Sequence, residues 1–198
     1  GGLSPEDAQE LKARFTPGVN GAGRTTVIEA DSISVQDTAV TPRDAHLLVP
    51  DNGAYCKRAA RLATLMGRRV TVLPVTEERP IAAAAVEAKL VADPSLTHVV
   101  LIHCETGTGV ENPLSEVAKA CEHRGVGLIV DAMSSFAALP IDARAIRFDA
   151  LVAASGKCLE GVPGMGFVLI RKAVLDACAG RSHSLAMDLH DQYVYMEK

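Results

Sequence analysis

Residues 127–136 read Gly-Leu-Ile-Val-Asp-Ala-Met-Ser-Ser-Phe, a short apolar run that ends in an acid and continues into small residues. The run has the length and composition of a buried β-strand, with Asp131 as its last residue. In open α/β sheets, ligands bind outside the carboxyl ends of the strands, so Asp131 is a candidate site residue. The alternative role for an acid at this position is a helix cap or a turn former.

Strand-like runs alternate with helical patterns around this stretch. The expected strands cover residues 45–49, 69–74, 97–104 and 127–131, and the expected helices cover residues 54–66, 81–92 and 113–123. Such alternation indicates βαβ units, whose right-handed crossovers build a largely parallel sheet covered by helices. We therefore predict a three-layer α/β fold with a mainly parallel sheet and helices on both faces. Two further strands, 148–154 and 166–170, and a helix over 172–179 follow.

A single lysine stands in the turn between these last two strands. Lys157 follows small residues and precedes the Gly/Pro-rich run Gly161-Val162-Pro163-Gly164. We expect its amine, at the rim of a packed sheet, to be partly desolvated, which favours the neutral form that attacks a carbonyl to make a Schiff base. The alternative is a surface lysine in a hairpin loop. Asp131 favours the first interpretation, because pyridoxal phosphate needs a carboxylate at its ring nitrogen besides its lysine.

Further motifs support this cofactor. The relevant segments are Asn52-Gly53-Ala54-Tyr55, His103-Cys104-Glu105-Thr106 with Thr108-Gly109, Val130 to Phe136, and Lys157-Cys158 with Gly161 to Gly164. In these segments the chain resembles the class V aminotransferases among the fold-type I pyridoxal phosphate enzymes, and within them most closely the 2-aminoethylphosphonate–pyruvate aminotransferases. A fifth segment, Ser184-Leu185 with Asp188-Leu189 and Asp191-Gln192, is similar to a stretch of that subfamily.

The resemblance implies a role for each site residue. Lys157 would bind the cofactor aldehyde and shuttle the proton, and Asp131 would pair with the pyridinium nitrogen. Thr106 would contact the cofactor near its phenolic oxygen, while Tyr55 and Met133 would pack on opposite faces of its ring. Taken singly, the last three residues have ordinary alternatives: a turn former for Thr106, an interface or helix-start aromatic for Tyr55, and core filler for Met133.

The implied reaction is transamination of 2-aminoethylphosphonate with pyruvate, giving phosphonoacetaldehyde and alanine. One alternative is another class V activity, such as the alanine–glyoxylate type. The other is a catalytically silent paralogue that acts as a dimerising or cofactor-binding domain. The resemblance also implies a homodimer with small-molecule amino donor and keto acid partners.

The two ends of the chain depart from the family. We expect residues 1–198 to form one pyridoxal-phosphate-binding large domain that is incomplete, with a divergent segment over 1–42 and without the small C-terminal domain. A helix is expected over Ala8–Phe15. The resemblance implies a glycine-rich turn that binds the cofactor phosphate before residue 43. The run Gly21-Ala22-Gly23-Arg24-Thr25-Thr26 is either a remnant of this turn or a flexible loop. Gly107 and Gly156 replace polar residues that are common in the subfamily.

Composition excludes several other classes of function. With 20 Lys and Arg against 24 Asp and Glu, the net charge of −4 gives no reason to expect nucleic acid or an anionic membrane as a partner. The five cysteines have no CxxC spacing, so neither a disulfide framework nor a metal site is expected, and a cytoplasmic location is favoured. No apolar run reaches the length of a membrane span.

Overall fold

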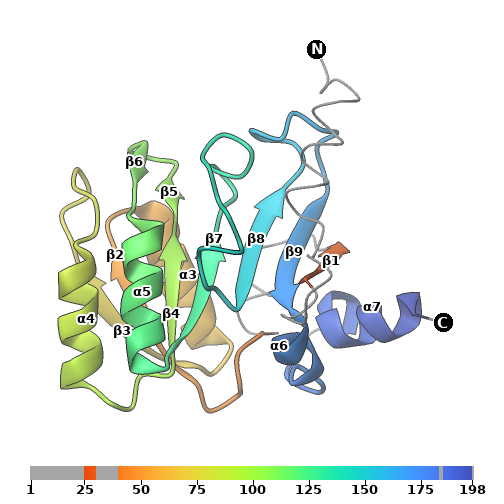
Figure 1. Ribbon diagram of the computed structural model, residues 1–198, viewed down its shortest axis with the longest axis horizontal. Helices are drawn as coiled ribbons and strands as arrows, with labels where there is room; N and C mark the ends of the chain where they lie inside the picture. Colours follow the sequence, from red (N-terminus) through yellow and green to blue (C-terminus); the bar gives the residue numbers. More distant parts are fainter. Residues whose placement is uncertain (1–24, 30–39, 183–184, 198) are drawn as a thin grey trace.

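A seven-stranded sheet forms the centre of the computed structural model, which describes residues 25–29, 40–182 and 185–197. Its strands are β1 (Thr25–Glu29), β2 (His46–Asp51), β3 (Arg69–Pro74), β4 (His98–Ile102), β7 (Gly127–Asp131), β8 (Ala150–Ala154) and β9 (Gly166–Arg171). They lie in the order β1-β9-β8-β7-β4-β2-β3 (Figure 1). Strands β3, β2, β4, β7 and β8 are parallel, whereas β9 is antiparallel to both β8 and β1.

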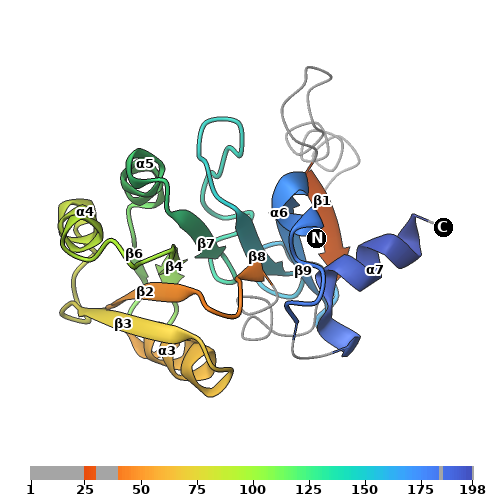
Figure 2. The same cartoon turned by 90° about the horizontal axis from the view of Figure 1, so that it is seen from below.

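Helices cover both faces of this sheet. They are α3 (Ala54–Leu65), α4 (Ala83–Ala92), α5 (Leu114–Arg124), α6 (Lys172–Asp176) and α7 (Leu189–Met196), with a 3₁₀ turn η1 (Leu185–Met187) before α7. Helices α4 and α5 lie on one side of the sheet and α3 on the other (Figure 2). A separate two-stranded hairpin, β5 (Cys104–Glu105) and β6 (Val110–Glu111), follows β4. None of the described helices is both long and apolar enough to cross a membrane.

The inner strands β4, β7 and β8 are almost wholly apolar because both of their faces are buried. In β7, Ile129 packs into the core on the α3 side, while Leu128 and Val130 pack into the core on the side of α4 and α5. The same period of two divides the side chains of the neighbouring strands β4 and β8 between the two cores. This alternation produces the three layers.

The predicted three-layer α/β architecture is confirmed, and the bounds of β3 and β7 match the expected strands. Two helices differ from the expected bounds by more than one residue: α4 begins at Ala83 and α6 ends at Asp176. The chain turns back between β8 and β9 at Gly164, whose φ of 105° favours glycine.

Strand β1 is the part of residues 1–39 that the structure describes. The helix expected over Ala8–Phe15 lies outside the described residues, as does most of the glycine-rich run, residues 21–24. The two threonines that end this run begin strand β1, which pairs with β9. Residues 25–29 therefore continue the glycine-rich run as a strand and not as a helix.

Candidate active site

The carboxyl ends of the adjacent strands β8, β7, β4 and β2 carry the expected site residues. Lys157 lies in the loop after β8, and Asp131 is the last residue of β7. Thr106 lies in the turn of the β5–β6 hairpin after β4, and Tyr55 lies in the first turn of α3 after β2. Because parallel strands end at the same edge of a sheet, the fold gathers at one edge residues that are far apart in the sequence.

Asp131 is a buried carboxylate that bonds through one oxygen to the described part of the chain. The residue is 6% exposed, and its Oδ1 accepts a hydrogen bond of 2.9 Å from the backbone N–H of Met133. Among the described residues, no donor bonds to Oδ2. Burial raises the pKa of Asp131 to about 6, against the lowering effects of the Met133 hydrogen bond and the charge of Lys157. A buried carboxylate with one unsatisfied oxygen is suited to receive a positively charged donor.

Ser134 joins the lysine to the threonine. The Nζ atom of Lys157 donates to Ser134 Oγ at 3.1 Å, and Ser134 Oγ is also hydrogen-bonded to Thr106 Oγ1. The ammonium of Lys157 lies 5.7 Å from the centroid of the Tyr55 ring, within the range of a cation–π contact. Lys157 thus lies close to Tyr55 and is linked to Thr106 through Ser134.

Met133 lies close to this group but is partly buried. It packs against the core on the α3 side, as core filler would. Its backbone N–H contacts Asp131, so the residue also shapes the site through its main chain. The structure therefore shows Met133 packed on the core, and its packing on the cofactor ring stays a prediction.

The expectation that Lys157 is partly desolvated is wrong for the described chain. Lys157 and its neighbours Gly156 and Cys158 are exposed. The reason is that the turn extends beyond the end of β8, away from the layers of helices that bury the strands. Gly156 packs closely on the other arm of this turn, where an added Cβ would lie 2.7 Å from Pro163 Cα. A residue with a polar side chain would not fit at position 156 in this conformation.

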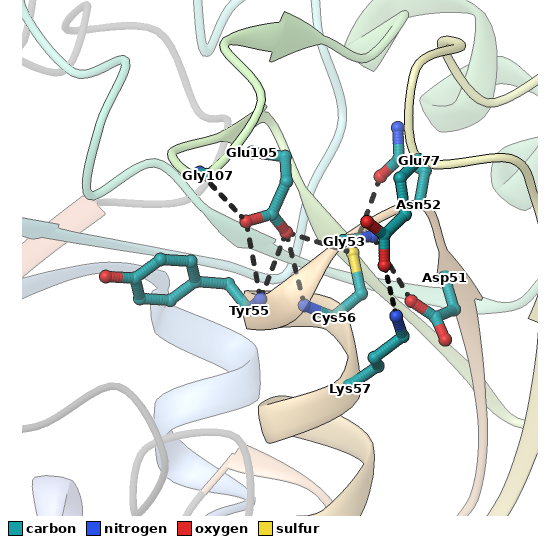
Figure 3. Close-up of polar contacts among 9 residues, drawn as sticks. All are labelled: Asp51, Asn52, Gly53, Tyr55, Cys56, Lys57, Glu77, Glu105 and Gly107. Carbon is teal, nitrogen blue, oxygen red and sulfur yellow. Dashed lines mark hydrogen bonds and ion pairs between the residues drawn. The ribbon is translucent and has the colours of Figure 1, made fainter.

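Glu105 is a further buried acid at this edge of the sheet. The sequence alone predicted no role for it. It is fully buried, and its carboxylate faces the start of α3, where it accepts hydrogen bonds from the backbone of Tyr55 and Cys56 (Figure 3). The sequence likewise predicted no separate role for Ser134. Both residues lie within the segments that follow strands β4 and β7, which is the signal that would have marked them as candidates.

The family model described as "Aminotransferase class-V" matches residues 20–187 of this chain. A protein of Polaromonas sp. strain JS666 named 2-aminoethylphosphonate–pyruvate transaminase 2 is 70% identical over 167 residues, which are 84% of this chain and 45% of that protein. The 2-aminoethylphosphonate–pyruvate transaminase 1 of Cupriavidus pinatubonensis is 59% identical over 167 residues, covering 44% of its length. The chain therefore spans less than half the length of these relatives.

Solved structures share the fold at much lower identity. The ureidoglycine–glyoxylate aminotransferase of Bacillus subtilis matches with a TM-score of 0.78 at 19% identity, over 96% of this chain and 49% of that one. The alanine–glyoxylate aminotransferase of Nostoc sp. also gives a TM-score of 0.78, at 18% identity and over 96% and 50% of the two chains. These likenesses agree with the architecture described above.

Proposed function

Because the chain belongs to the class V aminotransferase family, we propose that it acts in pyridoxal-phosphate-dependent transfer of an amino group from 2-aminoethylphosphonate to pyruvate. The products would be phosphonoacetaldehyde and alanine. The names of the relatives at 70% and 59% identity support this choice of substrates over those of other class V enzymes.

The observation that carries the proposal is the pairing of a buried acid with a nearby lysine at one edge of the sheet. Asp131 has an unsatisfied, buried Oδ2 among the described residues, which fits a protonated pyridine nitrogen. The charge of Lys157 acts on Asp131, so the two groups lie within electrostatic reach of each other. The residues present therefore fit the ring and the aldehyde of the cofactor.

Each residue would have a separate task. Pyridoxal phosphate, when bound, supplies an electron sink for the carbanion formed at the substrate. Asp131 would hold the positive charge at the ring nitrogen, and Tyr55 and Met133 would confine the ring. Lys157 Nζ would hold the aldehyde and then move the proton, with Ser134 Oγ and Thr106 Oγ1 orienting its amine through their shared hydrogen bonds.

An absorbance titration tests the proposal. The purified chain is mixed with pyridoxal phosphate, before and after addition of 2-aminoethylphosphonate, beside Lys157→Ala. Lys119→Ala, which removes an exposed lysine of α5, is the matched control. We expect a visible band that depends on Lys157 and bleaches with the donor. Positioned proton transfer contributes about 10²- to 10⁴-fold in rate, so Lys157→Ala should abolish turnover.

Three results would count against it. Turnover in Lys157→Ala comparable to that of the parent chain would refute the assignment of the lysine. A parent chain without a Lys157-dependent band would instead support the alternative of a catalytically silent domain. A band that bleaches with alanine but not with 2-aminoethylphosphonate would redirect the proposal to another class V activity.

A further inference from the structure

The carboxylate of Glu105 bonds to the first turn of α3. The residue is 0% exposed. Its Oε2 accepts from the backbone N–H groups of Tyr55 at 3.1 Å and Cys56 at 3.4 Å, and its Oε1 lies 3.3 Å from the Tyr55 nitrogen (Figure 3). Oε1 also accepts a longer bond of 3.4 Å from the N–H of Gly107. Both oxygens face donors, an arrangement that suits an ionised carboxylate.

The residues around Glu105 leave room for its side chain and bond to its carboxylate. An added Cβ on Gly53 would lie 2.2 Å from Glu105 Cγ, so only glycine leaves room for the side chain. Gly53 is the N-cap of α3 and provides no side-chain cap, and Glu105 instead accepts from the N–H groups of Tyr55 and Cys56 in the first turn. The thiol of Cys56 lies 3.6 Å from Oε2. Burial raises the pKa of this thiol to about 12, so it stays protonated and can donate.

Glu105 is also the residue that precedes Thr106. Its backbone lies in β5, and its carbonyl oxygen accepts the N–H of Gly109 at 2.7 Å across the turn of the hairpin. The side chain then reaches from this hairpin to α3, residues about 50 positions earlier in the chain. Glu105 therefore links helix α3, which carries Tyr55, to the β5–β6 hairpin, which carries Thr106. We call these two elements the walls of the site.

We infer that Glu105 is a positioning residue, which holds Tyr55 and Thr106 at a fixed separation across the site. It is not a catalytic residue, because it is fully buried and its oxygens are occupied by main-chain donors. The meaning of this role for cofactor binding rests on the proposed function. The tie between the two walls does not, since it is visible in the contacts of the chain itself.

A simple helix cap is the competing explanation, and the chain offers a control for it. Asp51 lies at the same end of α3, where its Oδ1 accepts the N–H of Gly53 at 3.2 Å. Asp51→Asn removes one negative charge from this helix end without touching the bonds to Tyr55 or Gly107. Glu105→Gln removes the same charge, keeps the side-chain volume and places an amide donor against main-chain donors.

The first readout is amide hydrogen exchange in the purified chain without cofactor. In Glu105→Gln we expect the amides of Tyr55, Cys56 and Gly107 to exchange about ten-fold faster or more, because charge-assisted hydrogen bonds are lost. Asp51→Asn should leave the Gly107 amide unchanged. If Gly107 keeps its parental rate in Glu105→Gln while only Tyr55 and Cys56 change, Glu105 is merely a cap and the inference is overturned.

The second readout is the dissociation constant for pyridoxal phosphate, followed by the Lys157-dependent band. Glu105→Gln should weaken binding by about ten-fold while the band still forms at saturation, and Asp51→Asn should bind as the parent does. Equal affinities of Glu105→Gln and the parent would overturn the inference. If the parent lacks the band, the proposed function fails, and the exchange of Gly107 still decides whether Glu105 ties the walls.

Glu105→Asp serves where the glutamine variant does not fold. It keeps the charge but is shorter by one methylene group, so it cannot reach α3 and the Gly107 amide together. We expect faster exchange at Gly107 and weaker cofactor binding in this variant too. Parental values for both in a folded Glu105→Asp variant would contradict the inference, because reach would then not matter.

Discussion

Replacing Asp131 by asparagine should remove a pH-dependent cost of folding. Burial raises the pKa of this carboxyl from 3.8 to about 6 in the folded chain. Below pH 3.8 the group is neutral in both the folded and the unfolded state, so it costs nothing. As the pH rises from 3.8 through 6 the unfolded chain loses its proton first, and the folded state becomes relatively less stable. Above pH 6 the full cost is about 3 kcal/mol.

Urea unfolding between pH 4.5 and 7.5, without cofactor, measures this effect. About 2 kcal/mol of the cost develops in this interval, because part of it is already present at pH 4.5. The free energy of unfolding of the parent should therefore fall by about 2 kcal/mol relative to Asp131→Asn as the pH rises across it. Effects of other titrating groups cancel in this difference, and the asparagine Oδ1 can still accept the Met133 N–H.

Asp44→Asn, which removes an exposed carboxylate, is the control for loss of a charge in general. A difference between the parent and Asp131→Asn that stays constant over the whole pH interval would refute the reasoning, since it would mean that the carboxyl titrates alike in the folded and unfolded chains. A confirmed slope would mean that the chain carries this acid at a cost to its stability. Such a cost is expected of a group kept for binding.

Two further predictions concern residues that support the site. Gly53→Ala should destabilise the chain by about 1 to 3 kcal/mol in thermal or urea unfolding, because its Cβ would overlap Glu105 Cγ. The same change in a Glu105→Ala background should cost much less, and equal costs in both backgrounds would show that the overlap is not the cause. Asn112→Ala should lower the free energy of unfolding in urea by about 3 kcal/mol. The buried Asn112 amide accepts from Asn52 Nδ2 and the Ile81 N–H and donates to the carbonyl of Ile102. A decrease below about 1 kcal/mol would mean that these groups find other partners.

The strands were predictable because their signal is local. Within each of the stretches 127–131 and 69–74, the apolar residues are near neighbours in the chain. The turn residues that end each stretch also lie close to it in the sequence. The end of α6 was less predictable. The apolar pattern of 172–179 continues past Asp176, but the helix stops there, and Cys178 still reaches the core from a turn.

Parts of the site were predictable for the same reason. Asp131 ends one buried strand and Lys157 lies in the loop that follows another, so an apolar run followed by a polar residue marks both of them. The exposure of Lys157 was not predictable in this way. How far a loop extends beyond a sheet depends on the packing of its two arms, here Gly156 against Pro163, and not on the strand that precedes it.

By itself, the sequence determined the succession of strands and helices, the burial of both sheet faces and the acid at the end of β7, because hydrophobic period and run length are properties of neighbouring residues. Only the tertiary structure decided that Ser134 lies between Thr106 and Lys157, and that Glu105 is buried at the start of α3. These contacts join residues separated by 23 to 50 positions. They depend on the order β8-β7-β4-β2 in the sheet, which brings the ends of distant strands together and which no local pattern encodes.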